Sequence, residues 1–185
     1  PSHALNISDY VNILNRFYIK LKISKSILIG HSFGGKVAAE FAVRYPQKIE
    51  KLVLYSTDLT KKKSLFKKYL LILVNILSSR KMSFLIKLFL KKSKISYKNF
   101  LVLCKTYTDA RLESKTSEKI SRFNKPILYI YGKYDFLFPL SKVKLNLKKL
   151  SQVRVVEFEK SSHLAHLEEE KKFTKKLLEF IKLNK

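Results

Sequence analysis

The stretch KSILIGHSFGGKVAAEF, residues 25–41, carries the clearest structural signal in the chain. It holds three of the only four glycines in 185 residues: Gly30, Gly34 and Gly35. In a chain this poor in glycine, such a cluster indicates a backbone geometry that larger residues cannot meet. The apolar run 27–29 predicts a buried strand, and residues 36–44 predict a helix that ends before a proline.

A strand, a tight turn and a helix form the context that a Gly-x-Ser-x-Gly motif requires. The turn would hold Ser32 in a strained conformation at the carboxyl end of the strand, and the helix N-terminus would favour negative charge beside it. We expect Gly30 and Gly34 to let the strand and the helix pass close together. The motif makes Ser32 a candidate nucleophile, with a plain strand-to-helix turn as the alternative.

The segment Gly30-His31-Ser32-Phe33-Gly34-Gly35 resembles the nucleophile elbow of the α/β-hydrolase family. This resemblance implies that Ser32 is the nucleophile and that the backbone N–H of Phe33 donates to an oxyanion hole. It also implies that the catalytic residues follow one another along the chain in the order serine, acid, histidine.

The rest of the chain alternates between strand and helix patterns. Strands are predicted over 49–56, 127–132 and 153–159, and helices over 6–21, 139–150 and 166–183. In the first helix we expect Ser8 or Asn6 as the N-cap and the following residues to face inward: Tyr10, Val11, Leu14, Phe17, Tyr18 and Leu21. The predicted fold class is α/β, a parallel sheet of about four strands flanked by helices, similar to the C-terminal part of an α/β-hydrolase fold.

Two carboxylates compete for the role of the acid. Asp135 follows the strand at 127–132 on a predicted loop, where the resemblance places the family acid. Asp58 lies just beyond the strand at 49–56, and some family members place the acid there. Either residue could instead be a loop carboxylate that accepts a hydrogen bond within a turn.

The candidate histidine lies in the segment Ser161-Ser162-His163-Leu164-Ala165-His166-Leu167-Glu168. This segment resembles the Gly-His-x-x-x-x-Glu pattern of the family, with Ser162 where glycine is usual. Aligned on Glu168, the catalytic position is His163, and His166 falls in the first helical turn. Two histidines spaced by three residues could bind a metal, but no set of carboxylates or cysteines accompanies them, so we predict neither a metal nor a cofactor.

These residues define a mechanism. His163 would accept the proton of Ser32 as general base and return it to the leaving group. Asp135 would hold the imidazole in the correct tautomer and stabilise the imidazolium.

The second oxyanion donor has no counterpart in the sequence. In the family it comes from a loop after an earlier strand, but the 29 residues before Gly30 contain no glycine. We therefore expect residues 1–56 and 122–185 to form a hydrolase core that lacks the first strands of the family sheet. The strand at 25–29 would then lie at an open sheet edge, and these residues alone would turn over esters slowly. The alternative is a divergent enzyme that uses another donor.

Residues 57–121 resemble the helical cap, or lid, that many family members insert at this point. Between Leu59 and Thr108 there are 13 Lys or Arg and no Asp or Glu. The whole chain has 39 basic and 14 acidic residues, a net charge of +25. Lysine-rich, Ile-rich and Asn-rich composition is typical of AT-rich coding, which explains much of this charge. Peripheral contact of the cap with an anionic membrane is the alternative, and nucleic acid is disfavoured because no binding module is present.

The function indicated by these observations is a serine hydrolase that acts on a carboxylic ester or a related small acyl compound. Dehalogenases are disfavoured because they use an Asp nucleophile, whereas amidases, peptidases and acyltransferases share the fold and leave the substrate open. The alternative is a non-catalytic or truncated remnant that binds a membrane surface or a partner. With one cysteine, Cys104, and no signal-like or 18-residue apolar segment, we expect a cytoplasmic protein, with a membrane-peripheral location as the alternative.

Overall fold

The computed structural model describes residues 5–59, 102, 116–148 and 150–183. The elements discussed below belong to one compact unit of the chain. In chain order they are α1 (Ile7–Lys20), β1 (Ser26–His31), α2 (Phe33–Arg44), η1 (Pro46–Lys48), β2 (Ile49–Tyr55), α6 (Thr116–Lys119), η2 (Ile120–Arg122), β3 (Ile127–Gly132), α7 (Leu140–Leu147), β4 (Val153–Phe158), α8 (Ala165–Glu168) and α9 (Glu170–Lys182).

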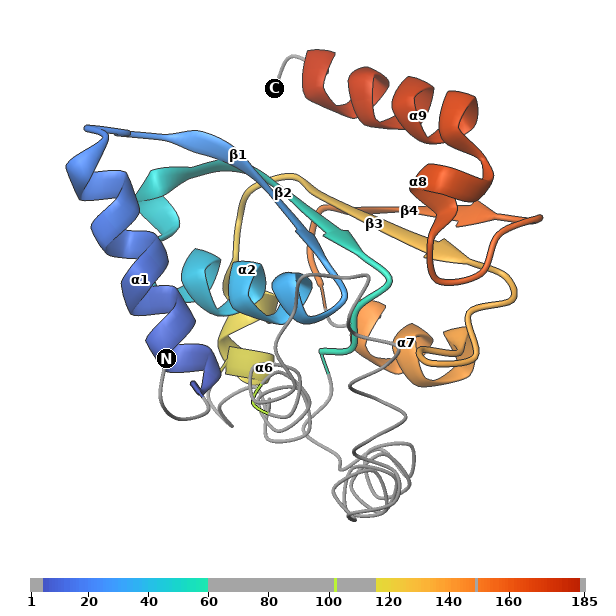
Figure 1. Ribbon diagram of the computed structural model, residues 1–185, viewed down its shortest axis with the longest axis horizontal. Coiled ribbons are helices and arrows are strands. Elements are labelled where there is room, and N and C mark those ends of the chain that lie inside the picture. Colours follow the sequence, from blue (N-terminus) through green and yellow to red (C-terminus); the bar gives the residue numbers. More distant parts are fainter. Residues whose placement is uncertain (1–4, 60–101, 103–115, 149, 184–185) are drawn as a thin grey trace, which may run out of the picture. The chain divides into compact units, whose positions relative to one another are not determined.

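The described strands form a parallel sheet in the order β1-β2-β3-β4 (Figure 1). Gly30 is paired with Leu54, Leu54 with Tyr129, and Tyr129 with Val155, so the four strands run in register with their carboxyl ends at one edge. The predicted α/β fold class is confirmed, and each predicted strand is present with ends that differ by at most two residues.

Side chains alternate between the two faces of the sheet, and helices cover both faces (Figure 1). Toward α8 and α9 lies a core of these residues: Val53, Tyr55, Leu128, Ile130, Phe158, Ala165 and Phe180. On the opposite face of the sheet, the intervening residues Leu52 and Leu54 are also fully buried. The helix α2 packs on β1 and β2, and its Phe41 is fully buried as well. Burial on both faces explains why residues 52–55 of β2 and 127–131 of β3 are all apolar or tyrosine.

The first helix corrects two details of the sequence prediction. Because α1 begins at Ile7, Asn6 occupies the N-cap position, and Ser8 lies inside the helix, where its Oγ accepts a hydrogen bond from Arg44 (2.9 Å). Val11 and Tyr18 are buried as expected. Phe17 and Leu21 are 52% and 54% exposed, so their predicted inward orientation is wrong. The buried stripe of α1 is narrower than the apolar pattern and does not include them.

The helix predicted over 166–183 is interrupted. Glu169 has non-helical φ and ψ (−133°, 53°) and separates α8 from α9. Its carboxylate accepts hydrogen bonds from the Ser161 Oγ (2.6 Å) and the Lys160 N–H (3.0 Å), contacts that tie the helix start to the preceding loop. At the other end of α9, the buried Lys51 of β2 donates to the carbonyl oxygens of Phe180, Ile181 and Leu183 and caps the helix.

The predicted cap, 57–121, lies mostly outside the described residues. At its end, the buried Thr116 of α6 donates its hydroxyl proton to Glu40 of α2. Within the described sheet β1 pairs only with β2, and Ile29 is 46% exposed, so the expected open edge is present there. No helix in the described part of the chain is long and apolar enough to cross a bilayer.

Candidate active site

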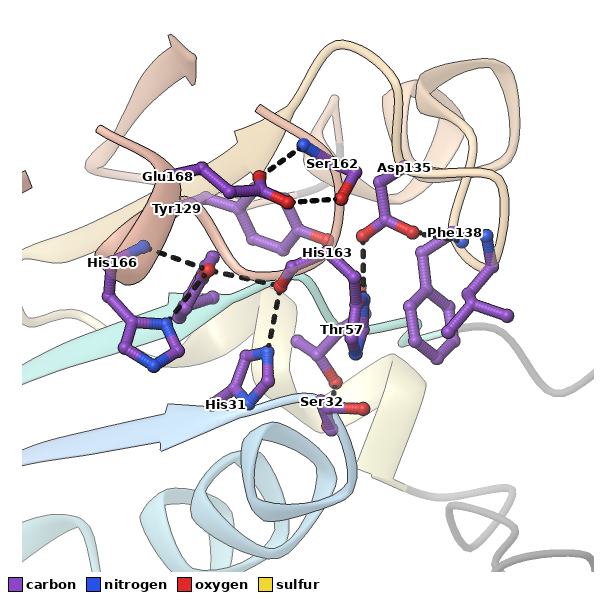
Figure 2. Close-up of polar contacts among 12 residues, drawn as sticks. His31, Ser32, Thr57, Tyr129, Asp135, Phe138, Ser162, His163, His166 and Glu168 are labelled. Atoms are coloured by element: carbon purple, nitrogen blue, oxygen red, sulfur yellow. Dashed lines mark hydrogen bonds and ion pairs between the residues drawn. The ribbon is translucent and has the colours of Figure 1, made fainter. Parts of the chain in front are cut away.

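The candidate catalytic residues lie at the carboxyl edge of the sheet. Ser32 directly follows β1, Asp135 lies three residues after the end of β3, and His163 lies in the loop after β4. Loops that follow neighbouring parallel strands meet at this edge, which is where open α/β sheets carry their sites. Figure 2 shows the His163 ring between Asp135 and Ser32.

Ser32 has the strained backbone that the motif predicts, with φ 52° and ψ −116°. Such a positive φ is uncommon for a residue with a Cβ and persists only where its surroundings enforce it. Three hydrogen bonds do so. The Ser32 N–H donates to the Tyr55 carbonyl (2.9 Å), and the Ser32 carbonyl accepts from the Thr57 hydroxyl (2.7 Å) and the Gly35 N–H (3.1 Å).

Close packing around Ser32 depends on Gly30 and Gly35. A Cβ on Gly30 would lie 2.5 Å from the Gly34 carbonyl oxygen, and one on Gly35 would lie 2.6 Å from the Thr57 Cβ. A Cβ on Gly34 would meet no described atom within 4 Å. The prediction that Gly34 allows the close approach is therefore wrong, because Gly35 is the residue that faces the neighbouring loop.

The helix α2 begins at Phe33, so its N-terminus lies directly beside Ser32. The first N–H groups of a helix have no partner within the helix, and the helix dipole adds partial positive charge there. The Phe33 ring packs edge-on against Tyr10 of α1 (5.0 Å between centroids). The Phe33 N–H lies in the first turn of α2, directly after Ser32.

The buried Asp135 and the partly buried His163 form a hydrogen-bonded pair. The distance from His163 Nδ1 to Asp135 Oδ2 is 2.9 Å, and Asp135 Oδ1 accepts from the N–H groups of Leu137 (3.0 Å) and Phe138 (3.1 Å). Burial alone would raise the pKa of Asp135, but the hydrogen bonds from His163 and Phe138 outweigh it and lower that pKa. An ionised carboxylate only accepts, so His163 Nδ1 carries the proton and Nε2 is left as the acceptor.

Of the two carboxylates considered, Asp135 is the one that binds His163. Asp58 is buried after β2, close to Lys36 of α2. Burial lowers the pKa of Lys36, and the charge of Asp58 partly opposes this. This electrostatic contact associates Asp58 with α2.

The loop that carries His163 lies directly on the end of β3. A Cβ on Gly132 would lie 2.0 Å from the Ser162 carbonyl oxygen, so only glycine allows this approach. Ser162 donates its N–H and its hydroxyl to the two carboxylate oxygens of Glu168, each at 2.5 Å (Figure 2). The serine that replaces the usual family glycine thus has a partner in the glutamate on which the segment aligns.

Sequence reasoning missed two residues that contact the His163 loop. His31 Nε2 (Figure 2) and the Tyr55 hydroxyl both donate to the His163 carbonyl oxygen, each at 3.0 Å. His31 occupies a variable position of the motif, and Tyr55 looks like an ordinary strand residue. No pattern in the sequence connects them with a histidine more than 100 positions away.

The second candidate histidine, His166, lies in α8 and not beside Asp135. Its Nδ1 is 3.2 Å from the Tyr55 hydroxyl, and its ring centroid is 5.7 Å from that of His31. Within the described ranges, no group of three or more His, Cys, Asp or Glu side chains is placed to hold a metal ion.

The family of the chain follows from a match to a family model. The model described as the alpha/beta hydrolase fold matches residues 1–120. The chain therefore belongs to the α/β-hydrolase fold family, as the elbow segment indicated.

Individual relatives are similar over parts of the chain or in fold. Homoserine O-acetyltransferase of Thermus thermophilus is 44% identical over 50 residues, which are 27% of this chain and 13% of that protein. The matches to curated relatives span between 10% and 19% of those proteins. An esterase from Exiguobacterium antarcticum has the same fold, with a TM-score of 0.80 at 18% identity over 99% of this chain and 76% of its own. A carboxylesterase from Nitrososphaera gargenis has a TM-score of 0.79 at 18% identity, over 96% of this chain and 72% of its own.

Proposed function

We propose that this protein is a serine hydrolase that cleaves carboxylic esters or related acyl compounds through an acyl-enzyme on Ser32. One observation carries the proposal: the hydrogen-bonded Asp135–His163 pair, at 2.9 Å, lies beside a strained Ser32 at a helix N-terminus (Figure 2). Nucleophile, base and orienting acid in this arrangement are the elements of a Ser-His-Asp triad.

Each residue has a definite role in the proposed reaction. His163 Nε2 accepts the Ser32 proton as Oγ attacks the ester carbonyl, and Asp135 stabilises the imidazolium that forms. The Phe33 N–H donates to the developing oxyanion. The tetrahedral intermediate collapses, the leaving alcohol takes the proton from His163, and the acyl group stays on Ser32. Water then attacks this ester with His163 again as base, which releases the acid and restores Ser32.

Similar proteins support an acyl substrate. The names of structural neighbours include carboxylesterase, esterase and enol-lactonase, and a relative is named an O-acetyltransferase. Hydrolysis and acyl transfer can share an acyl-enzyme and differ in whether water or another hydroxyl attacks it. Hydrolysis of simple esters is therefore the activity to test first.

The test uses the protein expressed from its complete reading frame and the nitrophenyl esters of acetate, butyrate and octanoate. We expect hydrolysis that saturates with substrate and falls at least about 10³-fold in Ser32→Ala and in His163→Gln, as for other triads. Ser26→Ala, at the opposite end of β1, serves as the matched control and retains activity. Hydrolysis that is absent in the wild type, or equal in Ser32→Ala, would instead support a non-catalytic hydrolase fold.

A further inference from the structure

The backbone of His163 is held by two side chains from neighbouring strands. His31 at the end of β1 and Tyr55 at the end of β2 both donate to the His163 carbonyl oxygen, at 3.0 Å each. A carbonyl oxygen has two lone pairs, so both donors can bind at once. Figure 2 shows the bond from His31 on the side of the loop away from the Asp135 carboxylate.

The Tyr55 hydroxyl is a hydrogen-bond donor to the His163 carbonyl oxygen. Its side chain is 2% exposed, and burial raises its pKa to about 12, so the hydroxyl keeps its proton at neutral pH. That single proton goes to the His163 carbonyl. The hydroxyl oxygen in turn accepts from the His166 N–H (3.3 Å) and lies 3.2 Å from His166 Nδ1. Tyr55 therefore joins the His163 loop to the start of α8.

His31 supplies the second donor in its neutral form. Burial lowers the pKa of His31, and this effect exceeds the opposing one of the hydrogen bond to His163. Since a carbonyl oxygen only accepts, the proton of the neutral ring lies on Nε2. The ring also packs against those of Tyr55 (4.4 Å between centroids) and His163 (4.8 Å), so its orientation is fixed on both sides.

We propose that His31 and Tyr55 are positioning residues, which hold the His163 backbone so that its imidazole can reach both Asp135 and Ser32. The inference rests on the proposed triad. The bond to Asp135 fixes only one ring nitrogen, and the ring can still swing about that contact if the loop moves. Residues 161–164 lie in neither a helix nor a strand, so side chains must supply the restraint. A displacement of about 1 Å at such a centre costs about 10²-fold in rate.

The test compares donor-removing and donor-retaining variants. His31→Leu and Tyr55→Phe each remove one bond to the His163 carbonyl, whereas His31→Gln keeps an N–H donor at similar reach. We expect kcat for a nitrophenyl ester to fall about tenfold or more in the first two, with KM changed less than about twofold, and His31→Gln to restore most of kcat. Tyr131→Phe, which removes a buried tyrosine hydroxyl that binds Glu157, is the matched control and keeps kcat.

A second readout does not depend on activity. The proton that His163 Nδ1 donates to Asp135 gives a hydrogen-bonded imidazole signal in proton NMR, assigned by its loss in His163→Gln. We expect this signal to shift or broaden in His31→Leu and Tyr55→Phe and to stay unchanged in Tyr131→Phe. An inactive wild type in which these changes still occur would contradict the proposed function and support the positioning role. Unchanged kcat and an unchanged signal in both donor-removing variants would overturn the positioning role, as would equal losses in Tyr131→Phe.

Discussion

At the scale of single residues, the proposed mechanism depends on the hydrogen bond between Asp135 and His163. Two backbone N–H groups fix Asp135 Oδ1, which leaves Oδ2 aimed at His163 Nδ1. The hydrogen bonds from His163 and from the Phe138 N–H lower the pKa of Asp135 despite its burial. The acid is therefore ionised throughout the pH range in which a histidine can act as base.

Asp135→Asn tests the choice of acid. An amide can donate to Nδ1 and stabilise the wrong tautomer, so we expect kcat/KM for a nitrophenyl ester to fall by about 10³–10⁴-fold. Asp58→Asn changes the rival carboxylate in the same way and should lose less than about tenfold. A larger loss of kcat/KM in Asp58→Asn than in Asp135→Asn would instead identify Asp58 as the acid.

His31 predicts a pH dependence of stability. Its pKa is lowered on folding, so the unfolded chain binds a proton more readily. The associated stability is fully present above the unfolded pKa of about 6.5 and is lost as pH falls through the folded value. His163, His166 and Asp135 are the charged or titratable groups that act on this ring.

We therefore expect the unfolding free energy of the wild type to fall, relative to that of His31→Gln, between about pH 7.5 and about pH 5. Urea unfolding at several pH values measures this difference, and the non-titrating glutamine is the internal control for all other groups. A difference that stays constant over this range would show that His31 is not buried as described.

At the scale of elements, the site depends on where strands and loops approach one another. The His163 loop approaches β3 so closely at Gly132 that a Cβ would overlap the Ser162 carbonyl oxygen. At Gly34, in contrast, a Cβ meets no described atom within 4 Å, and φ is not positive there. The sequence does not distinguish these two glycines, but the structure has room for a methyl group at Gly34 and none at Gly132.

Gly132→Ala should therefore displace the His163 loop. We expect a loss of about 1–3 kcal/mol in unfolding free energy, together with a large loss of ester hydrolysis, because the overlap involves backbone atoms that cannot rotate away. Gly34→Ala should leave the unfolding free energy unchanged or slightly raise it, since alanine favours the helix. Urea unfolding of the two variants settles the comparison, and equal losses would contradict the packing described here.

Much of the fold and of the candidate site could be predicted because their signals are local. Residues 52–55 and 127–131 are uninterrupted runs of apolar and tyrosine residues, and the elbow is a compact motif around Ser32. The break at Glu169 could not be predicted, because it accompanies contacts to Lys160 and Ser161 that helical periodicity does not encode. The bonds from His31 and Tyr55 arise only once β1, β2 and the distant loop are brought together.

At the scale of the whole molecule, the described sheet ends at β1 with apolar side chains exposed. Ile29 of β1 is 46% exposed, and on α1 Ile13, Phe17 and Ile19 are each more than half exposed. An apolar strand with an unpaired backbone edge favours pairing with another chain, whereas the net charge of +25 opposes it.

We expect the 185-residue chain by itself to self-associate at physiological salt, where screening weakens the charge repulsion. Light scattering coupled to gel filtration would detect species larger than a monomer. Ile29→Lys, which places a charge at the strand edge, should shift the distribution toward monomer, and Ile19→Lys on α1 serves as a control away from that edge. A monodisperse monomer for the unaltered chain would show that the edge is protected.

The nucleophilic character of Ser32 is the claim on which the proposed function depends. A fluorophosphonate reacts with an activated serine, whose oxygen displaces fluoride and forms a stable phosphonate ester. After reaction with the protein expressed from its complete reading frame, peptide mass analysis should find the adduct on the segment that contains Ser32 and no adduct in Ser32→Ala. An unmodified wild-type protein, or the same extent of modification in Ser32→Ala, would contradict the assignment of Ser32 as the nucleophile.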